Sequence, residues 1–557
     1  MISSITPKSP VVENGGGDAF GFRSGRNPGG HAFPYAVTRA PGFRFTSRVS
    51  TGIAEPQAVL SEAEEAFERW RRRVGFFLAP AVLITLWFIP FRGLSASASH
   101  LLAILAMAVV LWVTEALPMA VTALLGPTLC VVAGIGPAKE VFRTFADPII
   151  FLFLGSFILV EAMMKHGLNR RLAFLILGLP AVGDHPFRLY AAFGVITTFL
   201  SMWVSNAATT AMMLPIGIAI STEVARRESQ RLGTPIPFTR LPMATGIMLL
   251  TAFGASVGGL ATPVGTPPNL IGIGMIQKML GIKVSFFDWM RMGLPVAVLL
   301  GVCLVINFYF RCPVAPESLR GGSAWLEAEG KRLGAWTPAQ RNVLIVFASA
   351  VVLWLLPGVL TLFFGPEAPS VLWMNGRMPE SIVALLAAAV LFAWPLSWWR
   401  GEFTLTWSDA VRIDWGTIFL FAGGMALGEQ MFSTGLARWI GDGLAGVFHA
   451  KTVFGMTVLF TGVAILTSEA TSNTASATMV VPVAIAVAQA AGVDPLQPAL
   501  GACMGASMGF LLPVSTGPNA IVYGSGCVPI LQMIRHGALL DLIGFGVIVA
   551  TVTFLAR

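Results

Sequence analysis

Charged residues are scarce in this chain. Only 11% of its 557 residues are Asp, Glu, Lys or Arg, and 55% are hydrophobic, whereas a typical soluble domain carries about 25% charged residues. This balance excludes an ordinary soluble globule. Cysteine and histidine are also few: five cysteines and six histidines are dispersed along the chain, without a C-x-x-C pair or a zinc-type spacing. The cysteines are therefore interpreted as small buried apolar residues.

Two functional classes lack the residues that they require. The Gly330-Lys331 pair is followed by Arg, so there is no Walker phosphate-binding loop and an ATP-driven pump is disfavoured. No nucleophile is grouped with a base, which argues against an enzyme, and nothing calls for an organic cofactor. The net charge of +8 does not indicate nucleic-acid binding, because the basic residues stand at the ends of apolar segments.

What the chain does have is a series of long apolar runs. About 20 apolar residues cross a bilayer core as a helix, and strands of a membrane barrel would alternate over only about 10 residues. We therefore predict an all-α polytopic membrane protein with about eleven transmembrane helices. The predicted spans are 74–91, 99–117, 119–135, 148–165, 243–277, 290–311, 342–364, 380–399, 415–433, 497–530 and 537–556.

The basic residues give the predicted orientation. "RWRRR" at 69–73 precedes the first span, which places the N-terminus in the cytoplasm. Residues 1–60 are rich in Gly, Pro, Ser and Arg and are predicted to be a disordered tail, with an organellar transit peptide as the alternative to a bacterial tail. Residues 61–73 are predicted to form a cytoplasmic surface helix, and 312–341 a cytoplasmic linker. The expected location is a bacterial inner membrane.

The chain repeats itself in three landmarks that keep the same order. "FLFLGSFILVEAMMKHGLNR" (151–170) matches "FLFAGGMALGEQMFSTGLAR" (419–438). "SMWVSNAATTAMMLPI" (201–216) matches "TSEATSNTASATMVVPV" (467–483), and "TPVGTPPN" (262–269) matches "LPVSTGPN" (512–519). We therefore predict two halves, 74–311 and 342–557, related as an inverted repeat, which indicates a secondary transporter with its site between the repeats.

Each half is predicted to contain two interrupted elements. The stretches 188–222 and 453–489 are too long for one crossing and carry a polar Ser-Asn pair, so they are predicted to be re-entrant hairpins. The spans 243–277 and 497–530 contain Pro and Gly runs and are predicted to unwind within the membrane. In these runs, Asn269 and Asn519 are expected to cap the helix that follows.

Broken helices offer two kinds of binding chemistry. A half-helix N-terminus presents free N–H groups and about half a positive charge, which suits an anion. The neighbouring carbonyl, hydroxyl and amide oxygens suit an alkali cation. Two facing copies therefore suit a substrate with two anionic ends and at least two coupling cations.

Four acidic residues within or beside apolar runs have two interpretations each. Glu161 and Glu429 are repeat-related and are either functional intramembrane acids or caps of helix ends near the surface. Glu115, in "WVTEALP", and Glu469, before the second Ser-Asn pair, are interpreted rather as structural supports.

Together, "WVTEALP", "SMWVSNAATTAMMLP", "TPVGTPPN", "SNTASATMVVP" and "STGPN" resemble the divalent anion:sodium symporter family over residues 74–557. The resemblance implies a homodimer with a scaffold domain and a transport domain that moves like an elevator. It also implies sodium-coupled uptake of a dianion such as succinate, malate, fumarate or citrate, or in some members sulfate.

The resemblance also implies site residues, carried over motif by motif. The first sodium site would comprise Ser201, Ser205, Asn206 and Gly265, and the second Ser468, Thr471, Asn473 and Ser515. The substrate would contact Asn206, Thr266, Ser472, Asn473, Thr474 and Thr516.

One residue departs from the family pattern. Ala207 stands where the family usually has Thr, which removes a hydroxyl worth about 1 kcal/mol if it held a substrate oxygen. The prediction is a sodium-coupled importer of a small dicarboxylate. A sodium-independent anion exchanger and a sodium/sulfate carrier on the same scaffold remain the alternatives.

Overall fold

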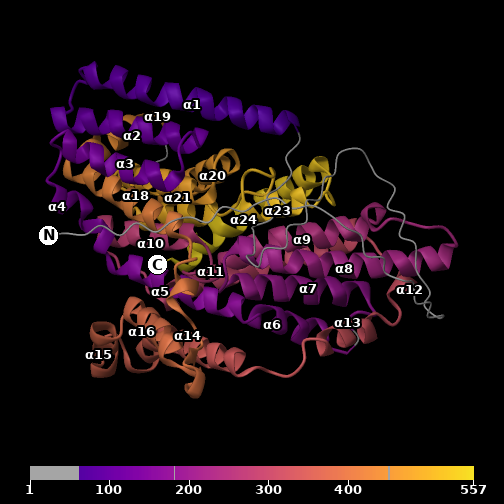
Figure 1. Ribbon diagram of the computed structural model, residues 1–557. Coiled ribbons are helices and arrows are strands. Elements are labelled where there is room, and N and C mark those ends of the chain that lie inside the picture. Colours follow the sequence, from indigo (N-terminus) through magenta and orange to yellow (C-terminus); the bar gives the residue numbers. More distant parts are fainter. Residues whose placement is uncertain (1–61, 181, 449–451, 557) are drawn as a thin grey trace, which may run out of the picture. The chain divides into compact units, whose positions relative to one another are not determined.

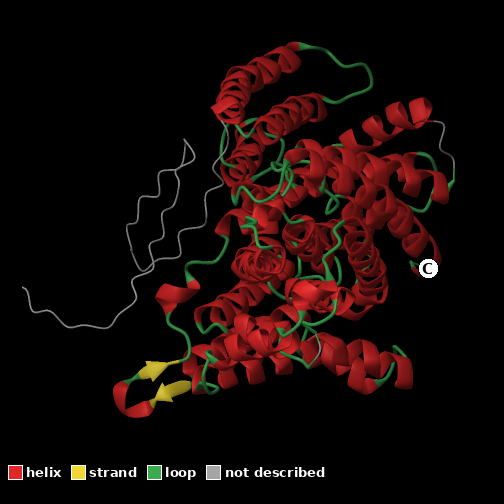
Figure 2. Cartoon of the chain, turned by 90° about the vertical axis from the view of Figure 1, so that its right-hand side faces the viewer, coloured by secondary structure: helices red, strands yellow, loops and turns green. Residues whose placement is uncertain are grey.

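The computed structural model describes residues 62–180, 182–448 and 452–556, and these residues form a helical protein (Figure 1, Figure 2). The predicted tail, residues 1–60, lies outside the described residues. Within the described chain, the strands are confined to one short antiparallel hairpin, in which β1 (Pro395–Ser397) pairs with β2 (Glu402–Phe403). The prediction of an all-α membrane protein is confirmed.

The helices of the first half and the linker follow the predicted order. Their bounds are α1 Glu62–Phe88, α2 Ala96–Thr114, α3 Met119–Val132, α4 Ala138–Val141, η1 Phe142–Ala146, α5 Pro148–Lys165, α6 Leu168–Leu177, α7 Pro186–Ser201, α8 Asn206–Leu232, η2 Phe238–Arg240, α9 Pro242–Gly259, α10 Pro267–Leu280, α11 Phe286–Arg311, α12 Pro316–Leu319 and α13 Gly322–Lys331.

The second half repeats most of this series. Its helices are α14 Pro338–Phe364, α15 Pro369–Arg377, α16 Glu380–Ala393, η3 Trp398–Arg400, α17 Trp407–Ala410, α18 Trp415–Ser433, α19 Leu436–Phe448, α20 Val453–Ala470, α21 Asn473–Ala490, α22 Leu496–Gly505, α23 Gly517–Gly524 and α24 Ile530–Leu555.

Local sequence explains where many of these helices begin. Asp147 caps α5 by accepting a hydrogen bond from the Ile149 amide, and Pro148 occupies the first helical position, where its missing N–H costs nothing. Ser285 and Asp288 form a reciprocal capping box at the start of α11. The helix starts are therefore encoded by neighbouring residues.

Nine helices in the described part of the chain are long and apolar enough to cross a membrane, or ten if the bent pair α15–α16 is one span. The count of eleven predicted from the sequence differs because it includes α1, α3 and α18 and the short pieces of the second broken segment, none of which meets this criterion of length and apolarity. It also leaves out the arms α8, α20 and α21, which are themselves apolar enough. In addition, α1 runs without a break through the predicted surface helix and the predicted first span.

The surface is apolar where a bilayer would cover it. Large apolar side chains stay exposed on α14 and α24, including Phe363 at 78% and Leu542 at 71%. A soluble protein rarely exposes extended apolar surface, whereas lipid tails cover it at no cost. The chain is therefore an integral membrane protein.

The two halves interlock in a crossed pattern. Helix α5 of the first half packs on α16 of the second, and α18 of the second half packs on α3 of the first. Repeat-related glycines allow both approaches: a Cβ on Gly155 would lie 2.6 Å from the Ala384 carbonyl carbon, and a Cβ on Gly423 would overlap the Ala123 carbonyl. The repeat seen in the sequence is thus a repeat of packing contacts between halves.

Two arginines of the first half hold the linker between the halves. Arg227, near the end of α8, donates hydrogen bonds to the carbonyls of Leu319, Arg320 and Gly321. Arg171, on α6, donates to the carbonyls of residues 333–335 at distances of 2.8 to 3.1 Å. The guanidinium of Arg171 also lies over the Trp336 ring. The linker is therefore held by α8 near its beginning and by α6 near its end.

Candidate substrate and cation site

The first Ser-Asn pair forms the tip between α7 and α8. Helix α7 ends at Ser201 and α8 begins at Asn206, with Ser205 as the N-cap that accepts a hydrogen bond from the Ala208 amide. The Ser201 hydroxyl donates to Asn206 Oδ1 at 2.9 Å. The hydroxyl at the end of one arm thus fixes the amide at the start of the other.

The second pair reproduces this arrangement between α20 and α21. The Ser468 hydroxyl lies 2.8 Å from Asn473 Oδ1 and also 2.8 Å from the Ala506 carbonyl. Ser472 is the N-cap of α21 and accepts from the Ala475 amide at 3.2 Å. Both tips therefore use the same Ser-to-Asn bridge and the same serine cap.

Each tip packs against an unwound segment of its own half. Helix α9 ends at Gly259 and α10 begins at Pro267, while α22 ends at Gly505 and α23 begins at Gly517. We call residues 201–207 with 259–266 the first half-site, and residues 468–474 with 506–516 the second half-site.

Two repeat-related asparagines brace the unwound segments. The Asn269 Nδ2 donates to the carbonyls of Gly259 at 2.8 Å and Thr262 at 2.7 Å. The Asn519 Nδ2 donates to the carbonyls of Gly509 at 3.1 Å and Leu512 at 3.0 Å. Both side chains therefore reach back into the loop, whereas the sequence led us to expect that they cap the following helix. The Pro-Asn pair present in both halves marked these residues in the sequence, but it did not show that their side chains point back toward the preceding loop.

Glycines at equivalent places let each tip approach its loop. A Cβ on Gly259 would collide with Asn206 Oδ1, and a Cβ on Gly509 would lie 3.2 Å from Asn473 Oδ1. A Cβ on Gly265 would lie 2.6 Å from the Gly259 carbonyl oxygen. Side chains at these positions would push the amide oxygens away from the loop carbonyls.

The structure groups the predicted cation ligands by half. In the first set, Ser201 and Asn206 are joined directly, and Gly265 lies against the Met202 carbonyl. Ser205 is exposed, and its hydroxyl oxygen is engaged in capping α8. The first set therefore lies within one half-site, and its role as a cation site stays a prediction.

The second set of predicted cation ligands also lies within one half-site. Ser468, Thr471 and Ser515 are 0%, 4% and 1% exposed. The hydroxyls of Thr471 and Ser515 donate to carbonyls, of Thr467 and of Gly509 or Leu512 respectively. Their oxygen lone pairs remain as hard-oxygen donors, which is the type of ligand that a small hard cation prefers. This second set also stays a prediction.

The predicted substrate residues come from both halves. Thr266 and Thr516 are the N-caps of α10 and α23, and the Thr516 hydroxyl accepts from the Asn519 amide at 3.2 Å. Thr474 follows Asn473 in the first turn of α21, which packs against α10. Ala207 meets the other half directly, because a Cβ on Gly517 would lie 3.3 Å from the Ala207 Cβ. The two half-sites therefore adjoin one another.

Helix N-termini supply the electrostatics of this region. Helices α8, α10, α21 and α23 all begin at the two half-sites. Each N-terminus carries a partial positive charge that attracts an anion, and α8 and α21 also begin with free N–H groups, whereas α10 begins with two prolines, which have none. None of the predicted site residues is basic, so backbone groups would supply the attraction.

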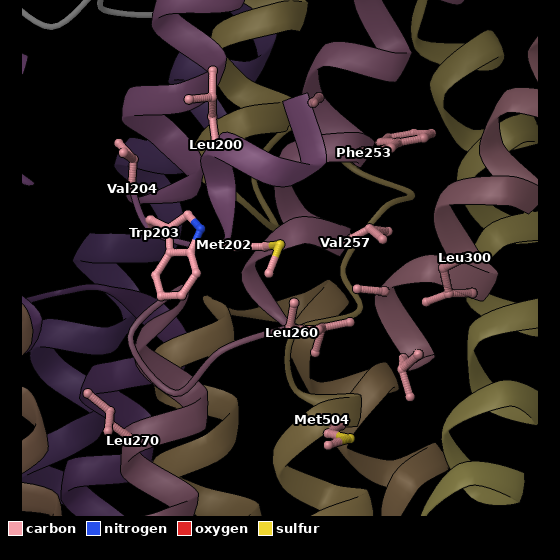
Figure 3. Packing of buried hydrophobic residues seen from close by; sticks show 14 of the residues in the cluster. Leu200, Met202, Trp203, Val204, Phe253, Val257, Leu260, Leu270, Leu300 and Met504 are labelled. Atoms are coloured by element: carbon pink, nitrogen blue, oxygen red, sulfur yellow. The ribbon is translucent and has the colours of Figure 1, made fainter. Parts of the chain in front are cut away.

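Apolar side chains pack around the first tip. Leu200, Trp203 and Val204 are buried beside the hairpin tip, and Leu260 of the unwound segment lies in the same cluster (Figure 3). Such packing raises the strength of nearby polar interactions by excluding water.

The two repeat-related acids lie among charged residues near the ends of their helices. Glu429 pairs with Arg143 at 2.5 Å and with Lys278 at 3.6 Å. Glu161 lies near Arg412, Asp409 and Lys165. These contacts favour the helix-end interpretation of both repeat-related acids over a role in the site.

The other two acids support the backbone, as the sequence suggested. Glu115 terminates α2 in a left-handed conformation with a φ of 48° and pairs with Arg71 at 3.0 Å. Glu469 Oε1 accepts from the amides of Phe510 at 2.6 Å and Leu511 at 2.9 Å. Glu469 therefore pairs N–H groups that the break between α22 and α23 leaves free.

Comparison with known proteins shows which family the chain resembles. A family model described as the sodium:sulfate symporter transmembrane region matches residues 71–555. The chain is 34% identical over 486 residues to the sodium-dependent dicarboxylate transporter SdcS of Staphylococcus saprophyticus, covering 86% of this chain and 91% of the relative. It is 32% identical to the SdcS of Staphylococcus aureus strain USA300, covering 86% and 90%.

Chains of solved structures are similar as well, and one of them illustrates the likeness. The crystal structure of the Alcanivorax borkumensis YdaH transporter, described as having an unusual topology, aligns with a TM-score of 0.47 and 13% identity. The alignment covers 77% of this chain and 88% of that one.

Proposed function

The chain belongs to the sodium:sulfate symporter family, and on that premise we propose that it couples the entry of sodium ions to the uptake of a small dicarboxylate of the succinate, malate or fumarate type. It is a membrane transporter and not an enzyme. Relatives at 32 to 34% identity over most of the chain are named sodium-dependent dicarboxylate transporters, which supports the choice of a dicarboxylate over sulfate.

The observation that carries the proposal is the duplicated half-site. Each copy joins a helix N-terminus to a Ser-Asn bridge and an unwound, carbonyl-rich loop. A dicarboxylate has two anionic ends, one for each pair of N-termini. Two carbonyl and hydroxyl sets hold two coupling cations, which offset the charge of the dianion during transfer.

In this mechanism the chain positions groups and makes no covalent bond. A sodium ion at the first half-site would draw together oxygens from both sides of the tip, those of Ser201, Ser205, Asn206 and Gly265. A second ion would do the same with Ser468, Thr471, Asn473 and Ser515. The tips held in this way present Asn206, Ser472, Asn473 and Thr474, and the N-caps Thr266 and Thr516, to the two carboxylates.

The movement is proposed to resemble an elevator. Helices α7 to α11 and α20 to α24 pack mainly on one another, whereas α3, α5, α16 and α18 form the crossed contacts between halves. This division supports a transport unit that carries both half-sites past a framework. A homodimer in a bacterial inner membrane, with the N-terminus in the cytoplasm, completes the proposal.

Radiolabelled succinate uptake into proteoliposomes tests the function. An inward sodium gradient is compared with potassium at equal ionic strength, and unlabelled malate, citrate and sulfate are added as competitors. We expect sodium-dependent accumulation that malate blocks and sulfate does not. Uptake that needs internal succinate but no sodium would establish an exchanger instead, and inhibition by sulfate alone would establish a sulfate carrier.

Two variants connect the function to the half-sites. Asn206→Ala and Asn473→Ala each remove an amide at one tip, and together they are expected to abolish sodium-dependent uptake. Asn375→Ala is the control, because Asn375 is exposed on α15, far along the chain from both tips, and accepts a long hydrogen bond from Lys283 at 3.5 Å. Normal sodium-dependent uptake by the double variant would rule out the proposed site.

A further inference from the structure

Two buried carboxyl groups lie beside the second half-site without a positive partner. Asp541, on α24, is 7% exposed, and apart from the neighbouring Glu469 carboxyl and the Phe510 backbone its carboxylate oxygens have no hydrogen-bond partner among the described residues. Glu469 uses Oε1 to accept the Phe510 and Leu511 amides, but its Oε2 is buried and has no partner either. The two carboxyl groups lie against each other and act on one another electrostatically.

The packing of α24 explains why Asp541 faces this place. Gly537 lies directly on the Phe510–Leu511 peptide, where a Cβ would collide with the Phe510 carbonyl. Asp541 follows one turn later on the same face of the helix, and Gly544, one further turn along, lies against Met508. The side chain of Asp541 is therefore directed at the unwound segment and at Glu469.

The first half lacks this pair at the equivalent place. Gly293 on α11 lies on the Leu260 carbonyl as Gly537 lies on that of Phe510. Four residues after Gly293 stands Ala297, and the residue after Ser201 is Met202, where the second half has Asp541 and Glu469. The same backbone arrangement thus forms with two apolar residues, so the carboxyl pair is not required for the fold.

The charge of this pair is the physical problem. Two ionised carboxylates can only accept hydrogen bonds, and placing them side by side away from water is very costly unless one of them holds a proton or a cation lies between them. Among the residues that the structure describes, no Lys, Arg or His pairs with either group. The nearby His536 contacts Asn307 instead.

We propose that Glu469 and Asp541 bind a sodium ion between their carboxylates, as a cation site in addition to the two predicted at the hairpin tips. Three oxygens of Glu469 and Asp541, which no other described side chain pairs, supply hard ligands of the type that alkali and alkaline-earth cations prefer. Because Glu469 also holds the Phe510 and Leu511 amides, an ion here links α24 to the second unwound segment. Its role in transport rests on the proposed sodium coupling, whereas binding itself does not.

Sodium binding can be counted without any transport. The purified protein is titrated with sodium chloride, with choline chloride keeping the ionic strength constant, and its unfolding midpoint is recorded. An ion that binds only the folded state stabilises it by mass action, so the steepness of the response reports how many ions bind. We expect Asp541→Asn and Glu469→Gln each to bind one sodium ion fewer than the unmodified protein.

The control and the contrary result are equally specific. Asp147→Asn removes a carboxylate at the start of α5, where an amide can still cap the helix, and should leave the number unchanged. An unchanged number in Asp541→Asn would overturn the proposal. A second result would also overturn it: both proteins bind the same number of sodium ions, but the unfolding midpoint depends on pH only in the unmodified protein. The carboxyl pair would then hold a proton and not a sodium ion.

Transport then places the ion in the cycle. In proteoliposomes with a voltage clamped by potassium and valinomycin, the voltage of zero net succinate flux gives the number of sodium ions per succinate. We expect this number to fall by one in Asp541→Asn and to stay unchanged in Asp147→Asn. If the unmodified protein, Asp541→Asn and Asp147→Asn all fail to transport succinate, the proposed function is refuted. The sodium titration then still decides whether the cation site exists. If the unmodified protein and Asp541→Asn transport the same number of sodium ions per succinate, the ion has no role in coupling.

Discussion

Replacing Asn269 by Ala tests whether the unwound segments are held in place by their asparagine braces. The change removes two fully buried hydrogen bonds, to the carbonyls of Gly259 and Thr262. The lost bond to Thr262 costs about 1 kcal/mol, because that carbonyl still accepts from the Gly265 amide at 3.3 Å, and the Gly259 carbonyl left unpaired costs about 1–3 kcal/mol. The braced conformation should therefore lose roughly 2–4 kcal/mol.

The loss should appear mainly in sodium binding. Gly265 lies against the Gly259 carbonyl, so a loop released at Gly259 no longer keeps the predicted cation ligands at fixed positions. A cost of about 2 kcal/mol corresponds to roughly a 30-fold weaker affinity. We expect the sodium concentration for half-maximal succinate uptake to rise by about that factor in Asn269→Ala, while saturating sodium restores much of the rate.

Repeat symmetry supplies a second copy of the experiment. Asn519→Ala removes the equivalent bonds in the second half and should shift the sodium dependence in the same direction. Asn375→Ala, on the exposed face of α15, should not shift it. Sodium dependence within twofold of normal in both brace variants, with normal amounts of folded protein, would refute the reasoning.

Three further predictions concern the framework around the site. Gly423→Ala should severely reduce the yield of folded protein in size-exclusion chromatography, because its Cβ would overlap the Ala123 carbonyl; normal yield would contradict the crossed packing. Burial alone would raise the pKa of Asp409, but bonds from Lys165 and Thr406 lower the pKa to about 2. The ionised carboxylate therefore contributes about 2 kcal/mol to the stability of the folded protein above pH 4, and this contribution should be lost as the pH falls from 4 to 2. The variant Asp409→Asn should flatten that acid transition. Arg171→Ala should speed proteolysis of the linker, because three carbonyl hydrogen bonds are lost, and an unchanged cleavage rate would show that the linker is held elsewhere.

The sequence predicted the helical membrane class correctly, because the signals for it are local. Long apolar runs identify spans, and the Ser-Asn pairs stand where α8 and α21 begin. The repeat could be seen because both copies kept the residues that a tip requires. Ala207 could be identified as a departure, and the structure adds that it meets Gly517 of the other half.

Other features depend on contacts that sequence order does not reveal. The backward reach of Asn269 and Asn519 follows from the shape of the unwound loops. The pairing of Glu429 with Arg143 joins residues far apart in the chain. The meeting of Glu469 with Asp541 also requires α24 to lie on the second unwound segment. Periodicity and capping rules apply within one helix, so they do not predict contacts between residues of different helices.

The crossed contacts of Gly155 and Gly423 also bear on how the protein is made. The first copy of the repeat is synthesised well before its packing partner, because α5 awaits α16 and α3 awaits α18. Until about residue 430 has emerged from the ribosome, the small-residue faces of the early helices have only lipid or the insertion machinery to contact. A chain truncated after the first half should therefore be a target for membrane quality control, although it contains a complete set of spans. Duplication of an ancestral half would, by the same reasoning, have become irreversible once each copy relied on the other for its interior surface.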